Sequence, residues 1–317
     1  MILRSIVDRM KAAPFRVVPE TVPKRPARRA NRTQPITRED APELPEQGKL
    51  AGILGAQDTL ADVARNESEY VHVSTLIRAC PRQVILSNRH GGQEVKRVEA
   101  GDRLIWALGR AAESHARRVL AAALPAHAYG IWTCRCGQRS FEGTFKAALE
   151  VGGNCSHCDT PLDQYREVLL IDEQRKVLAS PDFLLVYGTK FIPVEFKSIN
   201  KEGFDEQKEK PDAQADHELQ VLYYRRILQR GGKDVPYAII VYVRKDFKWG
   251  SNPYLEFRPT ENGRTTPSLD NMDIRAEAIR DARGAGPIPE KLGVCSSPIT
   301  PRAKACGMCA MCFSTNQ

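Results

Sequence analysis

Two apolar runs separated by a single turn signal constrain the fold more than any other feature of this chain. Residues 176–187 and 190–197 are rich in β-branched and aromatic residues, and Gly188 lies between them, which predicts an antiparallel hairpin. The second run, FIPVEFKSIN, places Glu195 and Lys197 two residues apart. Because successive strand side chains point to opposite faces, these two charges share one face of the predicted sheet. The other face carries Ile192, Val194 and Phe196.

The predicted hairpin can also bring Asp182 close to Glu195. Two neighbouring carboxylates repel one another unless a cation lies between them. Carboxylate oxygens suit a hard cation such as Mg²⁺ or Mn²⁺, so this segment predicts a divalent-metal site with the Lys197 ammonium beside it. The alternative interpretation is a plain Glu–Lys pair on the surface of an edge strand.

The remaining sequence alternates between helical and strand patterns, which favours an α/β fold. Predicted helices begin within 70–86 and occupy 102–124, 212–232 and 268–286; predicted strands occupy 166–172, 176–187, 190–197 and 237–245. The charged stretch 200–213 is predicted to be a solvated loop. We therefore expect one mixed sheet flanked by helices, within a single domain over 66–317.

The N-terminal segment 1–65 is predicted to be a disordered arm and linker. Residues 1–38 contain ten Lys or Arg and two acidic residues, whereas the whole chain has a net charge of +8, so the rest of the chain is nearly neutral. Such an arm can attract a polyanion by counterion release, or it can simply keep the protein in solution. The chain has no run of about 18 apolar residues, so no membrane span is expected.

Nine cysteines gather in closely spaced groups, which indicates metal binding in a reducing compartment more than disulfides. The segment 132–164 contains a CxC pair and, after 18 residues, a CxxC pair. Two such pairs can hold one tetrahedral Zn²⁺, so the segment is predicted to be a zinc ribbon, with His157 as a possible substitute ligand. The four predicted zinc ligands are Cys134, Cys136, Cys155 and Cys158.

A second group lies in the C-terminal loop 287–317, and a lone Cys80 precedes it by more than 200 residues. The late cysteines are Cys295, Cys306, Cys309 and Cys312. They could form a second zinc site by themselves, or three of them could join Cys80 in a site that ties the two ends of the domain together. Spacing alone leaves both arrangements open, and it does not separate zinc from an iron–sulfur cluster.

Four short motifs, taken in order, resemble one nuclease family. ACPR (79–82), SPD (180–182), EFK (195–197) and the QxxxY pair Gln220 and Tyr224 are similar to the signature of PD-(D/E)XK nucleases of the RecB-like branch. Within that branch the chain resembles the iron–sulfur exonucleases, which include CRISPR-adaptation nucleases and phage exonucleases. The resemblance covers about residues 70–317 and includes neither the arm nor the zinc ribbon.

The resemblance implies a restriction-endonuclease-like core and a role for each motif. Asp182 and Glu195 would hold Mg²⁺ or Mn²⁺, with the carbonyl of Phe196 as a further ligand. Lys197 would orient or help to deprotonate the attacking water and stabilise charge on the phosphate. Gln220 and Tyr224 lie on one helical face, which would face the active site.

The family also implies an acid or histidine on the first core helix, a few residues after a glycine. Glu113 has this spacing from Gly109, and His115 is its rival for the same role. An iron–sulfur cluster of the [4Fe-4S] type would use Cys80 and three of the four late cysteines. Cys306 and Cys312 have the family's spacing, so either Cys295 or Cys309 would complete the set.

These features together predict a metal-dependent DNA exonuclease that acts on DNA ends or single strands in recombination, repair or replication. The alternatives are a structure-specific or transposition-type endonuclease and a catalytically silent DNA-binding scaffold on the same fold. The expected partners are DNA and a recombination or helicase protein, in the cytoplasm of a bacterial, archaeal or phage-infected cell. The sequence does not determine strand polarity.

Overall fold

The computed structural model describes residues 69–78, 80–89, 100–246, 252–283, 286–291, 295, 297, 299–301 and 312–313. The predicted basic arm therefore lies outside the described residues, as do Cys306 and Cys309. No described helix is long and apolar enough to cross a membrane.

The centre of the fold is a seven-stranded mixed sheet. Its strand order is β10-β9-β8-β7-β2-β3, and β4 also pairs with β2. The β8–β9 pair is parallel, whereas the other ladders of this sheet are antiparallel. The strands are β2 (Ala128–Thr133), β3 (Ser140–Thr144), β4 (Gln164–Arg166), β7 (Phe183–Tyr187), β8 (Lys190–Ile199), β9 (Ile239–Arg244) and β10 (Tyr254–Phe257).

Helices flank this sheet and a smaller one. The smaller sheet has the order β1-β6-β5, formed by β1 (Val71–His72), β5 (Leu170–Asp172) and β6 (Val177–Ala179). The helices are α3 (Val73–Arg78), α4 (Pro81–Arg89), α5 (Ala100–Ala123), α6 (Phe145–Gly152), α7 (Lys201–Lys208), α8 (Ala215–Arg230) and α9 (Thr265–Ala282). The predicted α/β class, with a mixed sheet flanked by helices, is confirmed.

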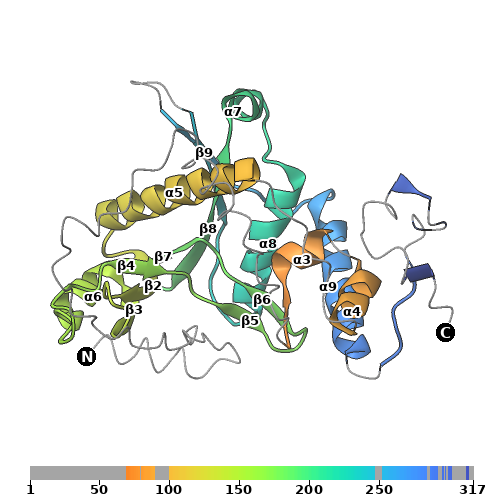
Figure 1. The fold of residues 1–317 in the computed structure, drawn as a ribbon, viewed down its shortest axis with the longest axis horizontal. Helices are drawn as coiled ribbons and strands as arrows, with labels where there is room; N and C mark the ends of the chain where they lie inside the picture. Colours follow the sequence, from red (N-terminus) through yellow and green to blue (C-terminus); the bar gives the residue numbers. More distant parts are fainter. Residues whose placement is uncertain are drawn as a thin grey trace, which may run out of the picture.

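The alternation of side chains along β8 divides the apolar core into two layers. Ile192, Val194 and Phe196 pack in one cluster with Ala116 of α5, as the alternation predicted. The other cluster contains residues of α8, among them Val221, Leu222, Tyr223 and Tyr224. Figure 1 shows β8 between the yellow helix α5 and the green helix α8. The face of β8 that carries Glu195 and Lys197 is therefore the face that α8 covers.

The predicted hairpin forms, but its first strand is shorter than expected. β7 and β8 pair in antiparallel register from Phe183↔Val194 to Tyr187↔Lys190, and Gly188 takes a φ of 62° in the turn, where a side chain would be strained. The apolar run 176–187 breaks around Pro181 into β6 and β7, which belong to different sheets. Proline lacks the N–H group that a continuous ladder needs, so it favours this break.

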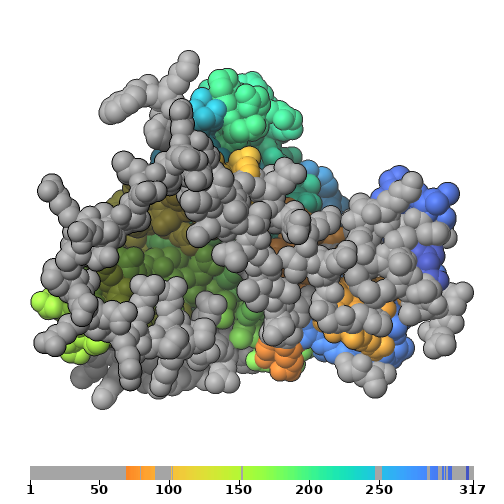
Figure 2. All heavy atoms as spheres, viewed as in Figure 1, coloured from red at the N-terminus to blue at the C-terminus, as the bar shows by residue number. Residues whose placement is uncertain are grey.

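The charged stretch 200–213, predicted to be a loop, contains the helix α7, so that prediction was wrong. Asn200 caps the helix by accepting a hydrogen bond from the N–H of Gly203 at 3.0 Å. Lys201 pairs with Asp205 one turn later, which favours a solvent-facing helix. In Figure 2 the green atoms at the upper edge of the view are where α7 lies in Figure 1.

Candidate functional site

The candidate site begins where β7 and β8 separate. Their last paired residues at this end are Phe183 and Val194, and beyond them β8 continues without β7 beside it. The Oδ2 atom of Asp182 accepts a hydrogen bond from the backbone N–H of Phe196 at 2.8 Å. A side-chain carboxylate therefore satisfies a strand N–H group that β7 no longer reaches.

The next N–H group on the same edge of β8 receives a second carboxylate. The N–H of Ser198 donates to Oε1 of Glu113 at 3.2 Å, and Glu113 comes from α5. The helix approaches closely because Gly109 has no side chain: a Cβ atom there would lie 2.6 Å from Oγ of Ser198. Glu113 therefore lies at the same strand edge as Asp182, whereas His115 is exposed to solvent.

The predicted Glu–Lys pair and the QxxxY pair meet on the α8 side of β8. Oε1 of Glu195 accepts hydrogen bonds from Nζ of Lys197 at 2.6 Å and from Nε2 of Gln220 at 3.0 Å. Gln220 also donates to the hydroxyl of Tyr224. The residue Glu195 is 4% exposed, and the side chain of Lys197 is 24% exposed. The side chain of Lys197 is therefore the more accessible member of this pair.

The site gathers more buried carboxyl groups than its own cations could offset if all of them were ionised. Burial is the largest reason why the pKa of Asp182 lies well above its usual range, and the charges of Glu195 and Glu167 act in the same direction. Burial also raises the pKa of Glu195, against the opposing effect of Lys197. The Oε2 atom of Glu195 is buried and has no hydrogen-bond partner among the described residues. An unsatisfied buried carboxylate oxygen next to a second carboxylate is a suitable ligand for a hard cation.

Glu167 and Arg117 are two further charged residues at this site, and the sequence analysis did not identify them. Nη1 of Arg117, on α5, donates to Oε1 of Glu167 at 2.8 Å, in the segment between β4 and β5. Glu167 raises the pKa of Asp182, and Arg117 lowers it. No local spacing connects the two residues, which are 50 positions apart. The one available signal was that Arg117 follows Glu113 by one helical turn.

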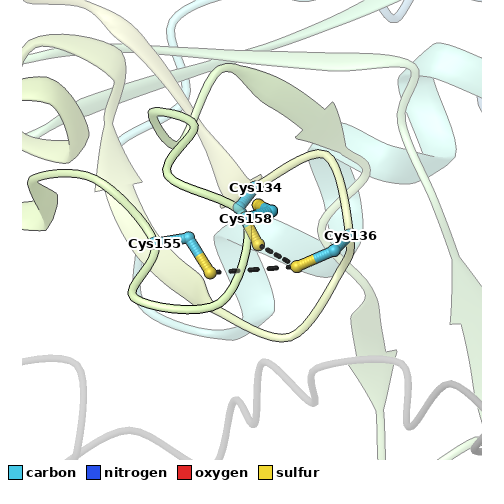
Figure 3. A group of neighbouring side chains, drawn as sticks. All are labelled: Cys134, Cys136, Cys155 and Cys158. Carbon is cyan, nitrogen blue, oxygen red and sulfur yellow. Dashed lines mark hydrogen bonds between the residues drawn. The ribbon is translucent and has the colours of Figure 1, made fainter.

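The four predicted zinc ligands lie together in the segment that joins β2, β3, α6 and β4. Their sulfur atoms are all within 4.8 Å of one another, and Sγ of Cys136 lies 3.3 Å from Cys134 and 3.8 Å from Cys155 (Figure 3). Zn–S bonds of about 2.3 Å at tetrahedral angles require sulfur atoms about 3.8 Å apart. This group of four cysteines has the geometry to hold zinc or another metal that prefers thiolates.

The four thiols differ in how easily they ionise, because their surroundings lower the pKa of Cys158 and raise that of Cys136. A hydrogen bond from the hydroxyl of Thr160, at 3.0 Å, lowers the pKa of Cys158 to about 6. The N–H of His157 donates to Sγ of Cys155 at 3.4 Å, so this residue contributes a backbone contact while four cysteines surround the centre. Strand β2 pairs with β7 of the central sheet, which connects the cysteine group to the strand that follows Asp182.

The first and last cysteine-bearing segments also lie against one another. Cys80 is buried at the start of α4, and its Sγ accepts a hydrogen bond from the N–H of Gln83 at 3.3 Å. The buried Arg82 donates to the carbonyl of Cys312 at 3.2 Å and to the carbonyl of Pro289 at 3.1 Å. Cys295 is buried as well. The described residues therefore bring the C-terminal segment to the helix that begins after Cys80.

No family model matches the chain, and no curated protein matches it. Among solved structures, the chain is similar to that described as the crystal structure of SSO0001, with a TM-score of 0.35 and 14% identity over 76% of this chain and 90% of the other. It is also similar to an alkaline exonuclease (LHK-Exo) from Laribacter hongkongensis, with a TM-score of 0.39 and 13% identity over 73% of this chain and 93% of the other.

Proposed function

We propose that the protein is a metal-dependent deoxyribonuclease of the PD-(D/E)XK type that removes nucleotides from DNA ends or from single strands. The observation that carries this proposal is the arrangement of Asp182, Glu195 and Lys197. Two buried carboxylates meet at the edge where β7 and β8 separate, one carboxylate oxygen has no partner among the described residues, and a partly exposed ammonium lies beside them. The order of the sequence motifs supports the same function.

The donor set fits Mg²⁺ or Mn²⁺. Asp182 and Glu195 would hold the cation, together with the carbonyl of Phe196, and Glu113 would supply a carboxylate from α5. When bound, the cation would offset the negative charge of the carboxylates and polarise the phosphate group. His115 is exposed and makes no described contact with this edge of β8, so Glu113 is the better candidate for the helix ligand.

The protein's own groups would orient the reactants. Lys197 would donate a hydrogen bond to the attacking water or to a phosphate oxygen, because its side chain is the more accessible member of the pair. In the reaction, the water oxygen bonds to phosphorus and the water releases one proton to the solvent. The bond from phosphorus to the leaving sugar oxygen breaks, and that oxygen takes up one proton from the solvent. Gln220 would keep Glu195 in position through its hydrogen bond to Oε1.

The remaining parts of the chain would serve binding and stability. We assign one nuclease domain to 66–317, with a zinc ribbon at 132–164 and a cysteine cluster in 287–317, preceded by the basic arm 1–65. The four cysteines 134, 136, 155 and 158 would hold Zn²⁺. Cys80 and three late cysteines would hold a [4Fe-4S] cluster, and the contact of Arg82 with the carbonyl of Cys312 supports this pairing of segments.

Cleavage of two DNA forms tests the proposal. End-labelled linear DNA and covalently closed circular DNA should be incubated with the protein and Mn²⁺, with the Asp182→Asn variant as the negative control. An exonuclease shortens linear DNA and spares the circle, whereas an endonuclease cuts both. Binding of DNA without any metal-dependent cleavage would support the silent scaffold and contradict the proposal.

A further inference from the structure

His217 belongs to the same face of α8 as the residues that contact Glu195. It precedes Gln220 by three positions and Tyr224 by seven, so the three side chains follow one another along one side of the helix. Gln220 contacts Glu195 of β8. Lys197 follows Glu195 by two residues along β8, a distance of about 7 Å in a strand. In the ladder with β9, Lys197 is directly opposite Tyr242.

Tyr242 connects His217 to the position of Lys197 on β8. The hydroxyl of Tyr242 lies 2.9 Å from Nδ1 of His217, and it accepts a hydrogen bond from the N–H of Gln214 at 3.0 Å. Tyr242 is fully buried. The α8–β8 contact therefore has two successive levels. At the first level Gln220 contacts Glu195. At the second level His217 contacts Tyr242, which lies opposite Lys197 in the sheet.

The hydrogen bonds of Tyr242 determine which nitrogen of His217 carries the proton. The hydroxyl oxygen of Tyr242 already accepts a hydrogen bond from the N–H of Gln214. Within the described residues, Nδ1 of His217 is the acceptor that the hydroxyl proton of Tyr242 can reach. Tyr242 therefore donates to Nδ1, which leaves the imidazole proton on Nε2. No described residue accepts a hydrogen bond from Nε2, so this N–H group is free to bind a ligand.

Burial keeps the imidazole of His217 neutral, and the positive charges around it favour an anion. Burial is the largest cause that lowers the pKa of His217 to about 4, and the positive charges of Lys197 and Arg78 add to it. The nearest acidic groups on α8 are each engaged: Asp216 pairs with Arg78 at 3.5 Å, and Glu218 pairs with Arg264 at 2.7 Å. A neutral N–H donor beside cationic groups is suited to a phosphate oxygen.

We propose that Nε2–H of His217 binds a non-bridging oxygen of the phosphodiester next to the scissile one, on the strand that is being cleaved. The inference rests on the proposed function, which places the cation and the scissile phosphate at the carboxylates of Asp182 and Glu195. His217 is one strand step beyond that position, at the level of Lys197. It would fix the register of the strand through a backbone phosphate and would therefore read no base.

Two substitutions separate this role from simple packing. His217→Asn keeps a polar atom at the position of Nδ1, toward Tyr242, and removes the donor at Nε2. His217→Gln places an amide nitrogen near the position of Nε2. If His217 only packs against Tyr242, the Asn variant should behave like wild type. If it binds phosphate, the Gln variant should retain more function.

The experiment measures binding without cleavage. In the Asp182→Asn background with Mg²⁺, the dissociation constant of a fluorescein-labelled single-stranded oligonucleotide is followed by fluorescence anisotropy over a range of salt concentrations. His217→Asn should weaken binding about tenfold, the value of one hydrogen bond to a charged group, and His217→Gln should weaken it less. Because the imidazole is neutral, the salt dependence should keep the same slope in all three proteins.

Tyr242→Phe provides a second test that keeps the ring of His217 in place. Loss of the hydroxyl removes the group that holds the proton on Nε2, so binding should weaken by a smaller factor than in His217→Asn. Thermal melting checks that each variant folds. Wild-type affinity in both His217→Asn and Tyr242→Phe would overturn the inference, as would a Gln variant weaker than the Asn variant.

The result is separable from the proposed function. Metal-dependent cleavage by the wild-type protein, measured on linear and circular DNA, tests the nuclease assignment without reference to His217. An active nuclease whose oligonucleotide affinity is unaffected at His217 would contradict only the phosphate contact. A wild-type chain that neither cleaves nor binds the oligonucleotide would contradict both.

Discussion

The side-chain amide of Gln220 donates to Oε1 of Glu195 at 3.0 Å and thereby joins helix α8 to strand β8 at the candidate site. Both side chains are buried, and the same oxygen accepts from Lys197. One carboxylate oxygen is thus fixed by two donors, while Oε2 has no partner among the described residues. The contact therefore fixes one oxygen of Glu195 and leaves the other available to a ligand.

Replacement of Gln220 by Met should lower metal affinity and cleavage by about 10- to 100-fold, the usual effect of losing a group that orients a metal ligand. The side chain is of similar size, so the fold should persist. Gln229→Met is the matched control, because Gln229 lies on the same helix and contacts the carbonyl of Val235 instead. Isothermal titration with Mn²⁺ and single-turnover cleavage measure the two effects. Equal values for the two variants would contradict the orienting role of Gln220.

The stabilising effect of Mn²⁺ should increase with pH. Because the pKa of Asp182 is raised in the folded protein, the metal-free folded state retains a proton that the unfolded chain has lost above about pH 4. Stability of the metal-free protein therefore falls as pH rises from that value toward the folded pKa, and a cation replaces the proton. Melting temperatures at pH 5 and pH 8, with and without Mn²⁺, should show the larger increase at pH 8. Asp182→Asn should reduce this difference.

Gly109→Ala should reduce cleavage by displacing Glu113. The added Cβ would lie 2.6 Å from Oγ of Ser198, so α5 or the hydroxyl must move. Gly101→Ala on the same helix is the control: a Cβ there meets nothing within 4 Å, and the change should stabilise by about 0.5–1 kcal/mol. The double variant Gly109→Ala with Ser198→Ala should recover activity, since it removes the contacting oxygen. A fully active Gly109→Ala protein would show that this approach of α5 is not required.

Cys158→Ser should release the metal of the four-cysteine group and lower thermal stability. Metal analysis of the wild-type protein should give about one zinc per chain at this tetrahedral site, and the variant should lose it. The melting temperature should fall because β2, which leads into the group, is a strand of the central sheet. The control Cys295→Ser should keep the zinc. Retention of zinc by Cys158→Ser would contradict the assigned ligand set.

Cys80→Ser should remove an iron–sulfur cluster and leave the zinc in place. Anaerobically purified wild-type protein should be brown, with about four irons per chain for a cubane cluster. The variant should lose the iron absorbance and melt at a lower temperature, because the cluster would close a loop of more than 200 residues.

Of Cys295→Ser and Cys309→Ser, one should lose iron and the other should keep it. Two zincs without iron would refute the cluster and leave the nuclease assignment standing, because that assignment depends on Asp182, Glu195 and Lys197.

Patterns within short segments were sufficient for much of the architecture. Alternation along β8 predicted both the shared face of Glu195 and Lys197 and the buried face that contains Phe196. Gly188 predicted the turn between β7 and β8. The spacing of four cysteines predicted a compact group of sulfur atoms. Each of these features follows from the geometry of a single strand, turn or loop.

Local signals also existed where the sequence interpretation failed. Asn200, which caps α7, and the Lys201–Asp205 pair are visible in the sequence, but a run of charges without an apolar stripe resembles a solvated loop. Pro181 signals the break between β6 and β7. The apolar character of the whole stretch concealed that break, because hydrophobic runs alone do not define where a strand changes sheets.

Tertiary structure alone decided which charged groups meet at the site. The sequence left Glu113 and His115 as rivals, and the close approach of α5 at Gly109 brings Glu113 to the N–H of Ser198 and leaves His115 exposed. The pair of Arg117 and Glu167 appears only once α5 crosses the sheet. A sequence determines periodicity and turn chemistry over a few residues, because those depend on local backbone geometry. Contacts between residues tens of positions apart depend on how packed elements cross, and no local pattern encodes that crossing.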